Sequence, residues 1–225
     1  MTAVALVGNP NCGKTTLFNA LTGAKQRVGN WPGVTVEKKY GQYTSAMTDV
    51  QVVDLPGIYS LTVLCEQSID EKIACEYLSS DTPDVVLNVI DGSNLIRNLY
   101  LTTQLLALGL PVVCAINHLD VLDSQGVTLD LSALSEALGC PVVGVVATRG
   151  RGINSLKRAL NKAFAKQHKP MFSLPLPDFL SDRLDALRRQ LFASGLSEAL
   201  AMPLLENDQV AQEKISPALR ERLNQ

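Results

Sequence analysis

The fold is decided by the stretch Gly8-Asn9-Pro10-Asn11-Cys12-Gly13-Lys14-Thr15, which matches the pattern G-x-x-x-x-G-K-[ST] at every position. It follows an apolar run of strand length at 3–7 and precedes a stretch of helical period at 15–22. In that context the glycines let backbone N–H groups turn inward around a phosphate, and the helix N-terminus adds partial positive charge. We therefore predict a phosphate-binding loop made of Gly8, Asn9, Asn11, Cys12, Gly13, Lys14, Thr15 and Thr16.

A magnesium site is predicted from two side chains of this loop and from a carboxylate at the end of a later strand. Lys14 is expected to reach the β- and γ-phosphates as a point charge, and the Thr15 hydroxyl to ligate Mg²⁺. Asp54 ends the apolar run 50–53, and a carboxylate at a strand end can hold Mg²⁺, usually through water. Gly57 follows in the pattern Asp-x-x-Gly, and its N–H can approach a γ-phosphate because no side chain blocks it.

Outward from the loop, apolar runs of strand length alternate with stretches of helical period. Further strands are predicted at 50–53, 85–90, 111–116 and 141–146, and helices at 98–108, 131–138 and 153–164. The strand runs are apolar throughout, as in parallel strands covered on both faces, whereas 36–44 alternates and is predicted to be an edge strand. The pattern predicts an α/β fold with a doubly wound, mostly parallel sheet, in which ligands sit at the carboxyl ends of the strands.

Composition divides the chain into two parts. Of the 225 residues, 1–166 carry the α/β pattern, 167–177 hold three prolines and are predicted to be a linker, and 178–225 are predicted to form a small all-α domain. Its helices are expected at 178–194, 206–214 and 217–223. The net charge of −2 gives no electrostatic case for nucleic acid. No signal peptide, membrane-length apolar run or Cys-x-x-Cys pair occurs, so a soluble cytosolic chain with free thiols is expected.

Guanine selection is predicted at the end of the run 111–116, in Asn117-His118-Leu119-Asp120. These residues resemble the Asn-Lys-x-Asp motif of Ras-like GTPases. The Asp120 carboxylate can accept hydrogen bonds from the guanine N1–H and 2-amino group, which adenine lacks. His118 stands where the family has lysine and is expected to substitute in part for the packing of the lysine stem over the base.

The next strand end, Ala147-Thr148-Arg149, resembles the Ser-Ala-Lys motif of the same superfamily, in which a backbone N–H contacts guanine O6. The motifs occur in the order of Ras-like GTPases, so the resemblance implies a Ras-like P-loop GTPase fold. It also implies binding of GTP and GDP with Mg²⁺, and hydrolysis of GTP to GDP and phosphate.

A narrower resemblance rests on Asn30-Trp31-Pro32-Gly33-Val34-Thr35 and on the run from Asp54 to Leu61. Both are similar to the ferrous iron transport protein B family. That family implies a G domain at the cytoplasmic face of the bacterial inner membrane, followed by a helical domain described as a GDP-dissociation inhibitor. It further implies a transmembrane iron-permease region of the same polypeptide as partner, and it permits a homodimer or homotrimer.

By this resemblance Thr35 is the switch threonine that ligates Mg²⁺ in the GTP state, and backbone groups of Gly33 and Val34 lie beside the nucleotide. Ras-like enzymes have a glutamine at the position after Asp-x-x-Gly. This chain has Ile58 there, and its side chain can neither donate nor accept a hydrogen bond. The family implies instead a K⁺ ion held by Asn11 and by carbonyls near Gly29–Trp31, so slow, K⁺-stimulated hydrolysis is expected.

The sequence leaves open the role of Trp31 and two alternative functions. Trp31, in a glycine–proline loop, is not expected in the core; it could shield the nucleotide or mark a dimer contact. An Era-like GTPase acting in ribosome or RNA maturation would share the phosphate loop and guanine motif. Because of Ile58, a nucleotide-gated binding module with negligible turnover is the other alternative.

Overall fold

The protein is described by a computed structural model that covers residues 2–23, 26–45, 48–61, 68–79, 83–166, 178–196 and 201–205, with 212, 215–217 and 219–220. Its elements are, in chain order, β1 (Thr2–Gly8), α1 (Lys14–Thr22), β2 (Gln26–Asn30), β3 (Glu37–Thr44), β4 (Asp49–Asp54), α2 (Ile69–Ser79), β5 (Val85–Asp91), η1 (Gly92–Asn94), α3 (Leu95–Ala107), β6 (Val112–Asn117), α4 (Leu119–Ser124), α5 (Leu131–Leu138), β7 (Val142–Gly144), η2 (Ala147–Arg149), α6 (Ile153–Lys166), α7 (Asp178–Ala193) and α8 (Ala201–Leu205).

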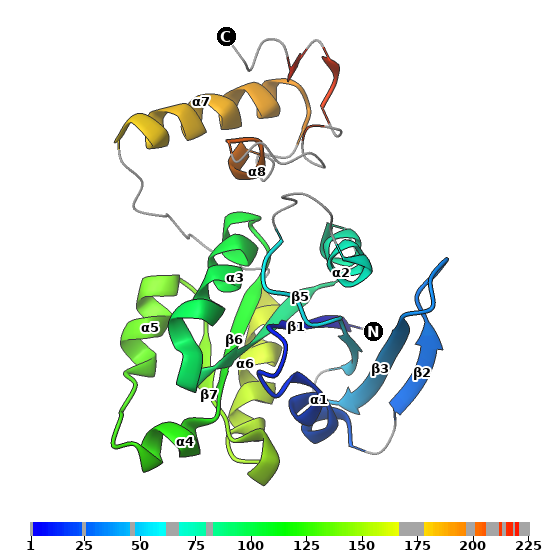
Figure 1. Ribbon diagram of the computed structural model, residues 1–225, viewed down its shortest axis with the longest axis vertical. Coiled ribbons are helices and arrows are strands. Elements are labelled where there is room, and N and C mark those ends of the chain that lie inside the picture. Colours follow the sequence, from blue (N-terminus) through cyan, green and yellow to red (C-terminus); the bar gives the residue numbers. More distant parts are fainter. Residues whose placement is uncertain are drawn as a thin grey trace.

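One seven-stranded sheet organises the first part of the chain, in the order β2-β3-β4-β1-β5-β6-β7 (Figure 1). The strands from β4 to β7 pair in parallel, and β2 and β3 pair antiparallel. The predicted doubly wound, mostly parallel α/β sheet is confirmed. The expected edge position of 36–44 is wrong, because β2 pairs with the outer side of β3 and forms that edge itself.

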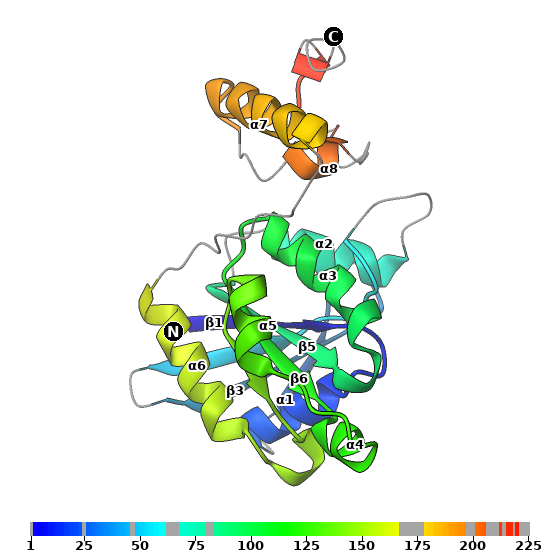
Figure 2. The ribbon, with the colours of Figure 1, turned by 90° about the vertical axis from the view of Figure 1, so that its left-hand side faces the viewer.

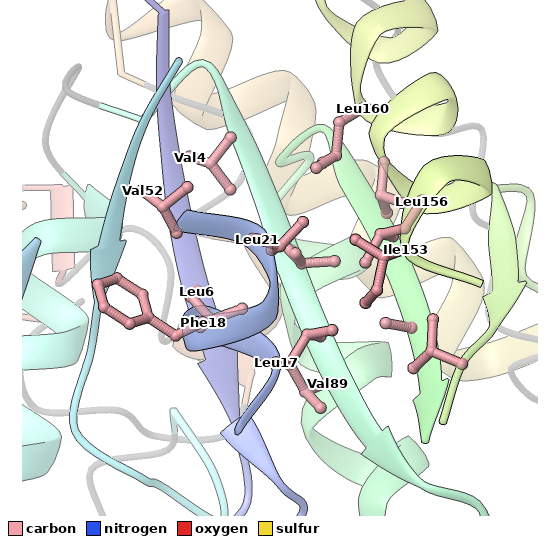
Figure 3. Close-up of a cluster of buried hydrophobic side chains, with 14 of the residues drawn as sticks. Val4, Leu6, Leu17, Phe18, Leu21, Val52, Val89, Ile153, Leu156 and Leu160 are labelled. Carbon is pink, nitrogen blue, oxygen red and sulfur yellow. The ribbon is translucent and has the colours of Figure 1, made fainter. Parts of the chain in front are cut away.

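Helices cover both faces of the sheet, as the uniformly apolar strands predict. On one face α1 and α6 pack Leu17, Leu21 and Leu160 against the Val4 and Leu6 side of β1 (Figure 3). On the other face side chains of α2, α3 and α5 share one core cluster with Ala5 and Val7 of the same strand. β1 is therefore buried on both sides, which fixes the position of the loop that leaves its carboxyl end.

The helical part has a small core of its own. Leu184, Leu187 and Leu191 of α7 are buried against Ala201, at the start of α8, and against Ile215 and Leu219. α7 and α8 lie beside each other, away from the sheet (Figures 1 and 2). The predicted linker 167–177 and most of the predicted helix 206–214 fall outside the described residues. Where the chain is described, it contains no helix long and apolar enough to cross a membrane.

Candidate functional site

The polar ends of the parallel strands meet at one edge of the sheet. Gly8 pairs with Val89 near the end of β5, Leu6 pairs with Asp54, and Asp91 pairs with Asn117. Since parallel strands in register end together, the phosphate loop, the Asp-x-x-Gly segment and the guanine motif converge on the site where such sheets bind ligands.

The phosphate loop turns sharply between β1 and α1. Asn11 and Gly13 have left-handed backbones, with φ of +67° and +87°. A Cβ added at Gly13 would overlap the side-chain amide nitrogen of Asn117, so the close approach of the loop to β6 requires glycine here. Within the loop the N–H of Cys12 donates to the Asn9 carbonyl at 3.3 Å. Thr15, by contrast, is exposed at the first turn of α1.

Lys14 and Asp54 form a close ion pair. The Lys14 ammonium donates to the Asp54 carboxylate at 2.5 Å, and the two side chains are only 12% and 6% exposed. Gly57 lies against the loop as well, because a Cβ there would be 3.2 Å from the Cα of Pro10. The N–H of Ile58 donates to the Gly8 carbonyl at 3.2 Å. The predicted phosphate and magnesium residues of the loop and the β4 end are thus brought together.

Ile58 itself turns away from this edge. Its side chain is 1% exposed and belongs to the core beneath α2 and α3. The side chain of Ile58 therefore takes no part in the site, and only its backbone lies there.

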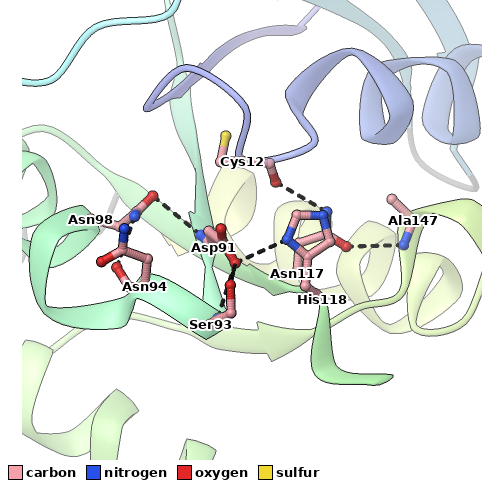
Figure 4. A network of polar contacts seen from close by, with 8 residues as sticks. All are labelled: Cys12, Asp91, Ser93, Asn94, Asn98, Asn117, His118 and Ala147. Atoms are coloured by element: carbon pink, nitrogen blue, oxygen red, sulfur yellow. Dashed lines mark hydrogen bonds and ion pairs between the residues drawn. The ribbon is translucent and has the colours of Figure 1, made fainter. Parts of the chain in front are cut away.

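Asn117 ties three segments of the site together (Figure 4). Its amide nitrogen donates to the Cys12 carbonyl at 3.1 Å, and its amide oxygen accepts from the N–H of Ala147 at 3.1 Å. Asn117 therefore joins the guanine motif to the phosphate loop and to η2. The Ala147 N–H is used inside the protein by this bond, and the exposed Thr148 remains the candidate for a backbone contact to a base.

His118 and Asp120 follow at the start of α4. His118 has a left-handed backbone with φ of +62°, and its Nδ1 lies 2.9 Å from the Asp91 carboxylate. The Asp120 carboxylate is 28% exposed and lies 3.7 Å from the Arg149 guanidinium. Burial raises the pKa of Asp91, but hydrogen bonds from His118 and Ser93 outweigh it, so the pKa is lowered overall. Asp91 was not predicted as a site residue, although its place at the carboxyl end of β5 was a signal.

The first-switch segment folds back on the protein through a tight turn. The N–H of Val34 donates to the Trp31 carbonyl at 3.3 Å, with Pro32 and Gly33 between them and φ of +76° at the glycine, as a type II turn requires. Thr35 is exposed on this loop. Its predicted contact with Mg²⁺ stays a prediction.

Trp31 is in the core, so the expectation that it lies outside the core is wrong. It is 7% exposed and meets the ring of Tyr77 on α2 edge-on, with centroids 5.5 Å apart. The partner on α2 lies 46 positions along the chain, and no local pattern around Trp31 could have identified it. Lys38 lies over the same indole at 4.6 Å.

The carbonyls near Gly29–Trp31, expected to help hold K⁺, lie at the β2 edge of the sheet. Gly29 and Asn30 pair with Lys38 and Glu37 in the β2–β3 ladder. The sheet order puts β2 three strand spacings from β1, or about 14 Å. The Trp31 carbonyl is used by the turn. The K⁺ site that the resemblance implied, with Asn11 and these carbonyls as ligands, stays a prediction.

Metal-ligating side chains do not cluster elsewhere in the described part of the chain, where no group of three or more His, Cys, Asp or Glu is positioned to hold an ion. Burial raises the pKa of the Cys12 thiol to about 11 despite the neighbouring Lys14, so this thiol is protonated at neutral pH. A neutral, buried thiol fits a loop residue that contributes only its backbone groups to phosphate binding.

Fold and site together define the class: this is a P-loop GTPase domain of the Ras-like type, with an appended helical part. The sequence profile described as ferrous iron transport protein B matches residues 2–160. The chain belongs to the ferrous iron transport protein B family. This assignment decides against the Era-like alternative.

Similar proteins support this family assignment. The Fe(2+) transporter of Salmonella typhimurium is 54% identical over 187 residues, which are 80% of this chain and 24% of that protein. The chain thus spans about a quarter of the length of the curated relatives it matches.

Solved structures are similar over nearly the whole chain. The cytosolic domain of L. pneumophila FeoB is 41% identical with a TM-score of 0.87, and the match covers 99% of this chain and 87% of that one. A GDP-bound mutant of the S. thermophilus FeoB G-domain is 39% identical with a TM-score of 0.89, and the match covers 100% of this chain and 86% of that one.

Proposed function

We propose that this chain binds GTP and GDP with Mg²⁺, hydrolyses GTP slowly, and thereby regulates ferrous iron uptake through a membrane region. The observation that carries the proposal is the Asn117 side chain, which bonds Cys12 of the phosphate loop and Ala147 beyond the guanine motif. This side chain holds the base-recognition motif beside the phosphate loop. The two segments can therefore bind the base and the phosphates of one nucleotide.

The donor set suits magnesium. Asp54 and the Thr15 hydroxyl offer oxygen ligands beside Lys14, and Mg²⁺ prefers oxygen donors together with phosphate and water. When bound, the ion would neutralise charge that develops on the transferred phosphate. Lys14, now paired with Asp54 at 2.5 Å, would turn to the phosphates. Thr35 would complete the ligands when its loop closes.

Slow turnover follows from the buried Ile58. A hydrocarbon side chain in the core cannot orient the attacking water, so backbone groups of the first switch, such as those of Gly33 and Val34, have to do so. Arg97, on α3, lies over the ring of Tyr59, at 4.5 Å.

Potassium stimulation is the finer part of the proposal. The Asn11 side chain is exposed on the phosphate loop and offers an amide oxygen, and a monovalent cation there would supply positive charge beside the phosphates. The first-switch carbonyls near Gly29 can join it only if β2 leaves β3, and order–disorder changes of this kind are common in GTPase switches.

The wider role rests on the relatives. They are named as Fe(2+) transporters, of which the matched part is about a quarter, and one of the similar solved structures is described as a cytosolic domain. We propose the transmembrane iron-permease region of the same polypeptide as partner, a position at the cytoplasmic face of the bacterial inner membrane, and a homodimer or homotrimer as possible assemblies.

The test is turnover of GTP and of ATP with Mg²⁺, in KCl and in NaCl. We expect hydrolysis selective for GTP and faster in KCl, and Asn11→Ala should remove the potassium effect while it preserves GDP binding. A matched control is Asn19→Ala, an exposed position on α1. Equal turnover of both nucleotides would overturn the guanine assignment, and equal rates in both salts would overturn only the role of potassium.

The second candidate, a nucleotide-gated binding module with negligible turnover, is favoured by one observation, the burial of Ile58. It predicts GDP and GTP binding of comparable strength with no phosphate release above background in either salt.

A further inference from the structure

The ring of His118 lies between a carboxylate and the phosphate loop. On one side its Nδ1 is 2.9 Å from Asp91 Oδ1 (Figure 4). On the other side, a methyl group placed on the Gly13 Cα would lie 3.4 Å from its Nε2. The left-handed backbone of His118 at the end of β6 directs the ring to this place. His118 therefore faces the segment that we propose holds the nucleotide.

Asp91 is itself held firmly. Its carboxylate accepts from the N–H and the hydroxyl of Ser93, at 3.0 and 2.7 Å, and its own N–H donates to the Asn98 side chain at 3.2 Å. The side chain is 21% exposed. Its position is thus determined by η1 and α3, independently of His118.

The pairing decides which ring nitrogen carries the proton. A carboxylate can only accept hydrogen bonds, and the pKa of Asp91 is lowered by His118 and Ser93, so it is ionised at neutral pH and Nδ1 must be the donor. The Nε2 toward the phosphate loop is then a lone pair in the neutral ring and an N–H donor in the charged ring. Histidine ordinarily changes charge within the physiological pH range.

We propose that Asp91 is a positioning residue of the nucleotide site, which holds His118 against the phosphate loop so that its protonation strengthens guanine-nucleotide binding. The inference rests on the proposed function. A charged Nε2–H would face an anionic ligand, whereas the neutral ring presents a lone pair, so affinity should rise as pH falls.

The other charged groups around His118 are already engaged. Lys14 from the phosphate loop pairs with Asp54, and Arg149 from η2 pairs with Asp120. On α4, Asp123 lies 3.5 Å from Arg151. The Cys12 thiol, with a pKa raised to about 11 by burial, stays neutral. Within the described residues, these charged neighbours are thus already paired, whereas the Nε2 of His118 faces the phosphate loop.

The experiment is the dissociation constant of a fluorescent GDP analogue between pH 6.0 and 8.5, for the unchanged chain and for His118→Met. The terminal phosphate of GDP also titrates in this range. The pH dependence of GDP affinity in His118→Met therefore reports the contribution of the phosphate without that of the imidazole. We expect the unchanged chain to gain about fivefold more affinity than His118→Met between pH 8 and pH 6, as for one solvent-exposed charge pair. His118→Lys, with a fixed charge, should follow the slope of His118→Met.

Asp91→Asn separates positioning from packing. An amide oxygen can still accept from Nδ1, so the ring stays in place, but the counter-charge is lost and the imidazolium is less favoured. The extra pH dependence should therefore persist and move to lower pH. Proton uptake on binding, measured by calorimetry in two buffers of different ionisation enthalpy, should accompany it and be absent in His118→Met.

Coincident pH profiles for the unchanged chain and His118→Met would overturn this inference and leave the proposed function intact. A profile of Asp91→Asn identical to that of the unchanged chain would overturn the role of Asp91. Failure to bind GDP more tightly than ADP at any pH would overturn the proposed function, and the inference with it.

Discussion

The indole of Trp31 stands edge-on to the phenol ring of Tyr77, with their planes at 75° and their centroids 5.5 Å apart. Trp31 begins the loop between β2 and β3, and Tyr77 lies on α2, which follows the Asp-x-x-Gly segment in the chain. Lys38 lies over both rings, at 4.6 and 5.7 Å. The two segments expected to respond to the γ-phosphate are therefore packed against each other through one aromatic contact.

Trp31→Ala should destabilise the sheet domain by about 3 kcal/mol, since truncation of a buried aromatic side chain removes transfer energy and leaves a cavity. The measurement is urea unfolding followed by far-UV circular dichroism. Trp31→Phe keeps an aromatic ring against Tyr77 and should cost less than half as much. If Trp31→Ala cost under about 0.5 kcal/mol, the range of an ordinary surface substitution, the indole would be a surface group in solution and the contact with Tyr77 would be incidental.

Features encoded by neighbouring residues could be predicted from the sequence, and features that depend on distant partners could not. The phosphate loop and the central strands were predictable because a contiguous motif and uniformly apolar runs encode them. β2 was not, because Arg27 and Asn30 lie in a polar stretch that pairs only once β3 is in place. Trp31 was misjudged because its burial depends on Tyr77, and Asp91 was missed because its partner His118 is 27 residues away.

Gly13→Ala should impair both stability and nucleotide binding. The position has φ of +87°, and the new methyl group would meet the amide of Asn117, which then can no longer bond the Cys12 carbonyl. Backbone strain of about 1 kcal/mol is therefore joined by the loss of the contact between phosphate loop and guanine motif. We expect affinity for GDP to fall by roughly tenfold or more, as for the loss of about 1.4 kcal/mol.

Gly109→Ala is the matched control for that change. Gly109 also has a left-handed backbone, with φ of +70°, but nothing lies within 4 Å of an added Cβ. It should show the strain in urea unfolding and unchanged GDP affinity. Equal loss of affinity in both variants would contradict the role given to Asn117.

Leu191→Ala should unfold the helical part without disturbing the sheet. Leu191 is fully buried between α7 and its neighbours, so the substitution should cost about 3 kcal/mol. The chain has one tryptophan, and it lies in the sheet domain. In urea, circular dichroism should therefore change earlier while tryptophan fluorescence keeps its midpoint. The adjacent Phe192→Ala, at a side chain 74% exposed, should shift neither; a fluorescence midpoint lowered by Leu191→Ala would mean that the two parts unfold as one.

Asp120→Asn should transfer the preference from guanine to xanthine nucleotides. By the proposed role of Asp120, its carboxylate would accept from both the N1–H and the 2-amino group of guanine. An amide offers one acceptor and one donor, which matches the N1–H and the 2-oxo group of xanthine and sets two donors face to face with guanine. Because an unpaired buried polar group costs about 1–3 kcal/mol, GDP affinity should fall by roughly 100-fold and XDP affinity should rise.

The control for this exchange is Asp123→Asn, on the same helix and with the same loss of charge. Asp123 is 62% exposed and lies 3.5 Å from Arg151, and such exposed pairs contribute little. Competition of GDP, XDP and ADP against a fluorescent nucleotide would measure both variants and the unchanged chain. The new amide can turn its NH2 group to the adenine N1, but its oxygen then faces the C2–H of adenine and gains no partner, so ADP should stay weaker than XDP. An unchanged ratio of GDP to XDP affinity in Asp120→Asn would show that the base binds elsewhere than at α4.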